Sequence, residues 1–137
     1  MVKENKNRKV NKMEITKKNQ MKEFVGDYTH ITFGCGSDRY PYEIVGITTD
    51  NKQLIIRRMD SVRIDNNGMS ESQDYEHKSN PSYELEYLRL YIPRKKYRNG
   101  DTRPPALVSS RLRGPVKWYH QTYGLCYTPS RYYDYSF

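Results

Sequence analysis

The sequence predicts a small all-β protein, or a β-rich α+β one, built as a twisted antiparallel sheet or a partly open barrel. Short stretches of β-branched and aromatic residues recur along the chain, and clusters of Gly, Asn, Asp and Pro separate them. A length of 137 residues is room for one domain. No stretch approaches the roughly 20 apolar residues that a membrane-spanning helix needs, so we expect no membrane partner.

Strands are expected where apolar and polar residues alternate, because one face of a sheet is buried and the other meets solvent. The first covers residues 28–33, and a glycine-rich loop over residues 34–38 ends it. The next two cover residues 42–48 and 54–58. Residues 50–52 between them form a tight turn of Asp, Asn and Lys, a composition that suits a hairpin.

The second half of the chain is less regular. Residues 63–82 contain almost no aliphatic side chains, which predicts a long polar connection. A strand is expected over residues 83–92, with a short helix as the competing interpretation, and residues 94–105 form a basic loop. Shorter strands, or turns at the C-terminus, are expected at residues 106–110, 116–119, 124–127 and 132–137.

The net charge of +8 is unevenly distributed along the chain. Residues 1–24 contain eight Lys or Arg and three Glu, a net of +5, whereas residues 25–137 carry a net of only +3. The first segment is too polar to bury much surface, so we expect a largely disordered basic arm over residues 1–24. The single β-rich domain is then expected to cover residues 25–137.

Metal binding and catalysis have little support in the sequence. Two cysteines, Cys35 and Cys126, are too few for a disulfide scaffold or a zinc site, although one bridge between them is an open alternative. The three histidines are isolated, without metal-ligand spacing, and no nucleophile motif is present. We therefore expect a protein that is not an enzyme and that needs no metal or cofactor.

Two segments of the first half are candidates for anion binding. In residues 34–41, two glycines let backbone N–H groups face an anion, and Arg39 adds charge beside Tyr40. The alternative is a hairpin loop in which Asp38 caps a turn and Arg39 pairs with it. In the third strand, Arg57 and Arg58 point to opposite faces, so one lies on the more buried side and needs a phosphate or a carboxylate. Pairing with Glu43 or Asp60 is the structural alternative.

The C-terminal half offers a third candidate. Residues 111–119 interleave basic and aromatic side chains, which suits phosphate contact by Arg113 and base stacking by Trp118. The alternative is that Trp118, the only tryptophan, anchors the core of a protein with few aliphatic residues. The aromatic segment 131–137 is expected to be packed, in a structural or subunit-contacting role.

Several stretches together resemble a group of small proteins encoded by phages and prophages. They are Ser37–Pro41, Arg58 after the hairpin, Asn67–Gln73, and Gly124 followed by Tyr132–Phe137. The resemblance spans residues 26–137. In size and β-rich character the chain is also similar to the Thoeris anti-defence family, whose members are oligomeric sponges for cyclic nucleotide signals. No ligand motif of that family matches here residue by residue.

The leading hypothesis is a non-enzymatic, phage-type protein of the host cytoplasm that sequesters a nucleotide or another phosphate-bearing small molecule, a cyclic nucleotide being one candidate. We expect it to be a homo-oligomer. One alternative is a nucleic-acid-binding accessory protein that uses the basic arm. Another is a protein–protein inhibitor or a structural phage component. The predicted contacts are Arg39, Arg57, Arg58 and Arg113 for phosphate, with Tyr40 and Trp118 for stacking on a base.

Overall fold

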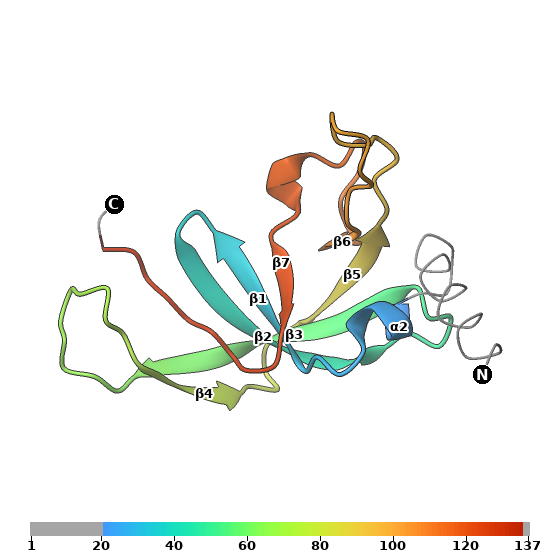
Figure 1. The fold of residues 1–137 in the computed structure, drawn as a ribbon. Helices are drawn as coiled ribbons and strands as arrows, with labels where there is room; N and C mark the ends of the chain where they lie inside the picture. Colours follow the sequence, from blue (N-terminus) through green and yellow to red (C-terminus); the bar gives the residue numbers. More distant parts are fainter. Residues whose placement is uncertain (1–20, 136–137) are drawn as a thin grey trace, which may run out of the picture.

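A computed structural model describes residues 21–135, which form one short helix, seven strands and a 3-10 turn (Figure 1). In chain order these are α2 (Met21–Val25), β1 (His30–Cys35), β2 (Asp38–Ile47), β3 (Gln53–Arg63), β4 (Tyr75–Ser79), β5 (Leu85–Tyr91), β6 (Ala106–Ser109), η1 (Trp118–His120) and β7 (Tyr123–Cys126).

Six of the strands close into an antiparallel barrel. The order is β2-β1-β7-β6-β5-β3, and a further pairing between β2 and β3 completes the ring. The prediction of a β-rich antiparallel fold is therefore confirmed, with the barrel closed. The pairing between β6 and β7 is the shortest in the barrel, because Leu107 opposite Tyr123 is its one aligned residue pair.

The core lies inside this barrel and is made of few aliphatic residues. Ile31, Leu54 and Ile56 have no exposed surface, and Leu88 and Leu107 are 1% exposed. They come from β1, β3, β5 and β6, so the core depends on closure of the barrel. This explains how a chain with only 35% hydrophobic residues can still exclude water from its centre.

Helix α2 covers the core beside the turn that joins β2 and β3 (Figure 1). Met21 and Val25 are buried in the core, and the backbone N–H of Lys22 donates to the side chain of Asn51. The folded unit therefore includes Met21, four residues earlier than the boundary expected from the charge pattern. The remainder of the expected basic arm, residues 1–20, lies outside the described residues.

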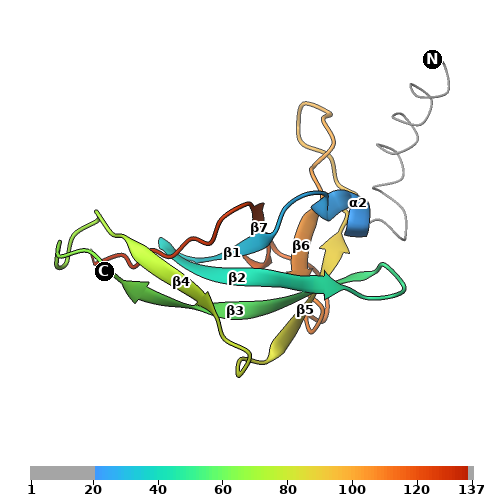
Figure 2. The ribbon, with the colours of Figure 1, turned by 90° about the horizontal axis from the view of Figure 1, so that it is seen from below.

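Strand β3 is long enough to serve two structures. Its first half, Gln53–Arg57, pairs with β5 in the barrel, and its second half, Met59–Arg63, pairs with β4. The β3–β4 hairpin thus projects from the barrel as an arm (Figures 1 and 2). Strand β4 corrects the expectation of a strandless connection over residues 63–82. Its sequence is polar because an edge strand pairs through its backbone and does not need apolar side chains.

A second correction concerns residues 116–119, which were expected to form a strand. They lead instead into the 3-10 turn η1. Gly114 has a φ of 77° and Pro115 follows it, so the backbone turns and loses a hydrogen-bond donor just before this stretch. Residues 21–135 contain no helix that is long and apolar enough to cross a membrane.

Candidate functional site

Residues 130–135, which we call the C-terminal segment, lie against the start of β2 and against the β3–β4 hairpin. The backbone N–H of Arg39 donates to the carbonyl of Tyr132 at 2.9 Å, and the N–H of Tyr132 donates back at 3.0 Å. The Arg39 guanidinium lies 4.8 Å from the centre of the Tyr132 ring, and its Nε donates to Ser130. Arg39, predicted to contact phosphate, is therefore held in contacts with the chain's own C-terminal segment.

Tyr40 is also occupied by neighbouring side chains. The guanidinium groups of Arg58 and Arg131 lie over its ring, at 4.7 and 4.5 Å from the ring centre. Arg131 also lies over Tyr75 and Tyr133. Arginines of the protein therefore lie over the Tyr40 ring that was predicted to stack on a ligand base.

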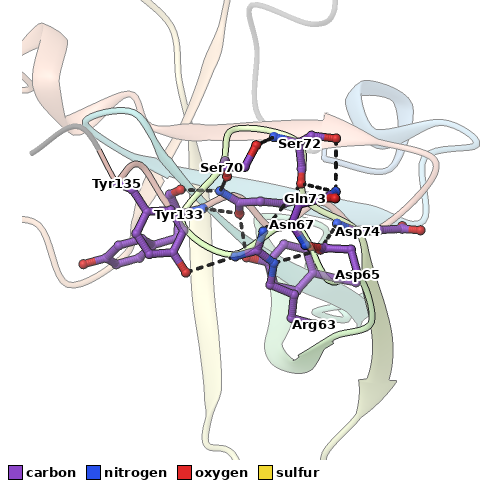
Figure 3. Close-up of polar contacts among 10 residues, drawn as sticks. Arg63, Asp65, Asn67, Ser70, Ser72, Gln73, Asp74, Tyr133 and Tyr135 are labelled. Atoms are coloured by element: carbon purple, nitrogen blue, oxygen red, sulfur yellow. Dashed lines mark hydrogen bonds and ion pairs between the residues drawn. The ribbon is translucent and has the colours of Figure 1, made fainter.

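The end of β3 and the loop between β3 and β4 contact Tyr133 and Tyr135 of this segment (Figure 3). Arg63 donates to Asp65 at 2.8 Å and to the Tyr135 hydroxyl at 3.0 Å. The side chain of Gln73 donates to the carbonyl of Tyr133 and accepts from its N–H. Hydrogen bonds from Arg63 and from backbone N–H groups of the loop hold the pKa of the Asp65 carboxyl well below its usual range. We call the contacts that residues 130–135 make with residues 38–40 and with the loop between β3 and β4 the tail clamp.

The tail clamp brings together three of the stretches that were singled out from the sequence. Residues 37–41 supply Asp38, which accepts a hydrogen bond from the backbone N–H of Asp134, and residues 67–73 supply Gln73. Residues 132–135 are the segment that is held. These stretches therefore have a direct structural role, because they hold residues 132–135 against β2 and the β3–β4 hairpin.

Arg57 takes the structural alternative raised from the sequence. Its Nε and Nη2 donate to Oε1 of Glu43 at 3.0 and 2.5 Å, and Ser79 of β4 donates to the other carboxylate oxygen. Both charged side chains are largely covered, at 21% and 16% exposed. Burial raises the pKa of Glu43, but the hydrogen bonds from Ser79 and Arg57 and the charge of Arg57 outweigh it and lower the pKa overall. Arg57 is thus not available as a phosphate ligand.

This pair predicts an acid-sensitive contribution to stability. Because the folded-state pKa of Glu43 is below its unfolded value of about 4.3, the pair stabilises the fold above that pH and the effect is lost as pH falls through the folded pKa. Glu43→Gln should lower the free energy of unfolding by about 1 to 2 kcal/mol at pH 7 and by less at pH 3. Urea denaturation of both proteins at several pH values between 3 and 7 measures this. A difference in free energy of unfolding that stays the same across these pH values would contradict it.

A groove lies beside the start of β5, with a volume of about 540 Å³. We call it the β5 groove. Its wall contains arginines, tyrosines, carboxylates and serines from β2, β3, β5, β6 and the connection after β6. The lining residues are Tyr42, Gln53, Arg58, Tyr83, Glu84, Leu85, Glu86, Tyr87, Ser109, Ser110, Arg111 and Arg113.

The arginines of the β5 groove form no ion pair within the described chain, and Arg58 also lies over the ring of Tyr40. The two ion pairs between residues 21 and 135 are Arg57–Glu43 and Arg63–Asp65, so Arg58, Arg111 and Arg113 form none there. The hydroxyl of Ser110 is buried without a hydrogen-bond partner among the described residues. The groove therefore offers cationic groups and a polar atom that a ligand can satisfy.

Tyr42 and Glu86 both line the groove, and Tyr42 is 7% exposed. Burial raises the pKa of Tyr42, and the charge of the nearby Glu86 carboxylate raises it further. The Tyr42 phenol therefore holds its proton more tightly than an exposed tyrosine does.

The six predicted site residues thus divide between several places. Arg58 and Arg113 meet at the β5 groove, whereas Arg39 and Tyr40 belong to the tail clamp and Arg57 to the pair with Glu43. Trp118 lies at a separate cavity and is 84% exposed, so the alternative of a core anchor is wrong.

The sequence reasoning missed the tyrosines and glutamates of the β5 groove. Tyr83 and Tyr87 alternate with Glu84 and Glu86 within the expected strand 83–92, so a signal was present. It was read only as strand periodicity, because alternation shows which residues share a face but not which strand end opens on a groove.

The described part of the chain contains no metal-binding cluster and no disulfide. Residues 21–135 hold no group of three or more His, Cys, Asp and Glu side chains placed to bind a metal ion. Cys35 and Cys126 are both free thiols, so the disulfide left open from the sequence is not formed. The chain matches no protein-family model, no curated protein and no solved structure. The case for a function rests on the chemistry of the β5 groove.

Proposed function

We propose that the protein binds a nucleotide, or a related phosphate-bearing small molecule, in the β5 groove and sequesters it without converting it. One observation carries the proposal. Arg58, Arg111 and Arg113 line one groove, and none of them forms an ion pair within residues 21–135. Arginine presents a planar set of N–H donors that matches two phosphate oxygens, so three such groups favour a phosphorylated ligand.

The rest of the wall supports a nucleotide over inorganic phosphate. Tyr83 and Tyr87 are 38% and 41% exposed and offer aromatic surface to a base. Glu84 and Glu86 accept hydrogen bonds, as the hydroxyls of a ribose or the amino group of a base require. A volume of about 540 Å³ lies within the roughly 300 to 1,000 Å³ typical of small-ligand pockets.

The same carboxylates argue against a long polyanion in this groove. A continuous nucleic-acid backbone would pass phosphates close to Glu84 and Glu86, where like charges repel. A small ligand avoids this by directing its phosphate to the arginines and its hydroxyls to the glutamates. The proposed groove and the resemblance to phage proteins together lead us to propose a counter-defence role in the host cytoplasm. A homo-oligomer would perform it by holding its ligand.

The test is binding of nucleotides to the full chain and to a groove variant. Calorimetric titration with linear and cyclic mononucleotides and dinucleotides should find at least one ligand. Arg111→Ala with Arg113→Ala should then weaken binding of that ligand by at least about 100-fold, since each lost charged hydrogen bond costs about 1.5 to 3 kcal/mol. Both side chains are exposed, so the fold should be kept, as circular dichroism would verify.

The matched control is Arg94→Ala with Arg98→Ala, which removes the same charge from an exposed loop that does not line the groove. It should leave the affinity within about twofold, because the net-charge effect is small at ordinary salt. Equal loss in both double variants would point to nonspecific attraction. No binding of any nucleotide to the unmodified protein would overturn the proposal.

A further inference from the structure

The only tryptophan of the chain is held out into solvent. Trp118 is 84% exposed and lies in η1, next to Tyr119, which is 55% exposed. The backbone N–H of Lys117 donates to the His120 ring at 2.9 Å, which fixes the turn. Tyr119 packs edge-on against Trp118, with ring centres 5.6 Å apart. A large aromatic surface presented on a fixed turn is typical of a contact surface.

The neighbourhood of Trp118 is strongly basic. A cavity of about 370 Å³ is lined by Trp118 together with Lys95, Arg103 and Lys117. Residues 94–103 carry five Lys or Arg and a single acid, Asp101. These basic residues and Trp118 come from the two connections that flank β6, and both connections extend beyond the barrel strands in Figure 1. We call residues 94–103 and 116–121 the basic lobe, so Arg111 and Arg113 of the β5 groove lie outside it.

Arg103 adds a polar group without a partner. Its guanidinium lies 4.8 Å from the centre of the Tyr97 ring, and its Nε is buried with no hydrogen-bond acceptor among the described residues. A buried donor of this kind costs free energy until an acceptor is supplied. The basic lobe therefore combines stacking surface, positive charge and an unsatisfied donor in one place.

We propose that the basic lobe binds single-stranded nucleic acid. Bases would stack on Trp118 and Tyr119, and phosphates would pair with Lys95, Arg103 and Lys117. Stacking on a protruding ring needs an unpaired base face, which a duplex does not present. The lobe also lacks the interleaved glutamates of the β5 groove, so a continuous backbone meets little repulsion. This site is separate from the proposed nucleotide groove.

The single tryptophan makes the site directly observable. Titration of the full chain with a dT oligomer of about 12 nucleotides should quench Trp118 emission, because a stacked base contacts the indole. Raising the salt from 50 to 200 mM should weaken binding, with a slope of about 0.7 in log Kd against log salt for each phosphate contact. In anisotropy with a labelled oligomer, Trp118→Ala should weaken binding about 10-fold, as expected for one lost stacking contact.

Controls separate this site from the β5 groove and from general basicity. The Arg111→Ala, Arg113→Ala variant should bind the oligomer within about threefold of the unmodified protein. Duplex DNA and polyglutamate at equal charge should quench Trp118 little. Oligomer binding without a change in Trp118 emission would overturn the proposal, since binding would then lie elsewhere on the chain. Equal quenching by polyglutamate would also overturn it, and would assign the lobe to an acidic protein partner.

Discussion

Replacing Leu54 with alanine is expected to lower the free energy of unfolding by about 3 to 4 kcal/mol. Leu54 has no exposed surface and lies in β3, opposite Leu88 of β5 and Ile47 of β2. It therefore contacts the core where β3 joins both of its barrel neighbours. The substitution removes buried methyl groups and leaves a cavity that the closed ring cannot easily collapse.

Urea denaturation followed by circular dichroism measures this effect, since the exposed Trp118 is a poor reporter of the core. Val62→Ala is the matched control, because Val62 lies in the same strand but is 59% exposed. It should change the free energy of unfolding by less than about 0.5 kcal/mol. Similar losses in the two variants would mean that β3 does not supply the barrel core.

Replacing Arg131 with alanine is expected to release the C-terminal segment and to cost about 2 kcal/mol. The Arg131 guanidinium lies over the rings of Tyr40, Tyr75 and Tyr133, and it donates to the carbonyls of Arg39 and Tyr132. Contacts between a cation and a ring are worth about 0.5 to 2 kcal/mol, and charged hydrogen bonds about 1.5 to 3 kcal/mol, so a net loss near 2 kcal/mol allows for water replacing some of them.

Hydrogen exchange at the backbone amides of residues 130–135 distinguishes this from a general loss of stability. In the Arg131→Ala protein those amides should lose protection while the amides of β1 and β3 keep theirs. Arg131→Lys should recover only part of the effect, because an ammonium cannot lie flat against several rings. Unchanged protection in residues 130–135 would show that other contacts hold the segment.

Local sequence signals were sufficient for most of the barrel. The turn before β3 could be located because Asp50 and Asn51 favour it, and Asn51 takes a φ of 60°, a region that asparagine tolerates. Strand β4 escaped prediction for a physical reason. Tyr75 and His77 alternate with charged residues, but a polar edge strand is held by its partner's backbone, and no hydrophobic pattern marks it.

The site was predictable only in part, because its geometry depends on residues distant in sequence. Alternation correctly placed Arg57 and Arg58 on different faces, but the partner of Arg57 decides which of the two stays open to a ligand. The sequence predicts that Arg39 contacts an anion or pairs with Asp38, whereas one of its partners, Ser130, comes 91 residues later. Distant pairing of this kind leaves no local signal.

The closure of the barrel also dictates the order in which the chain can fold. β1 pairs with β7, and the hydrogen bond between Thr32 and Cys126 joins residues 94 apart. During synthesis the β2–β3 hairpin can form early, but one edge of β1 stays unpaired until β7 has left the ribosome. We expect slow folding, on a millisecond-to-second scale, and an interval in which the exposed edge of β1 is prone to aggregation.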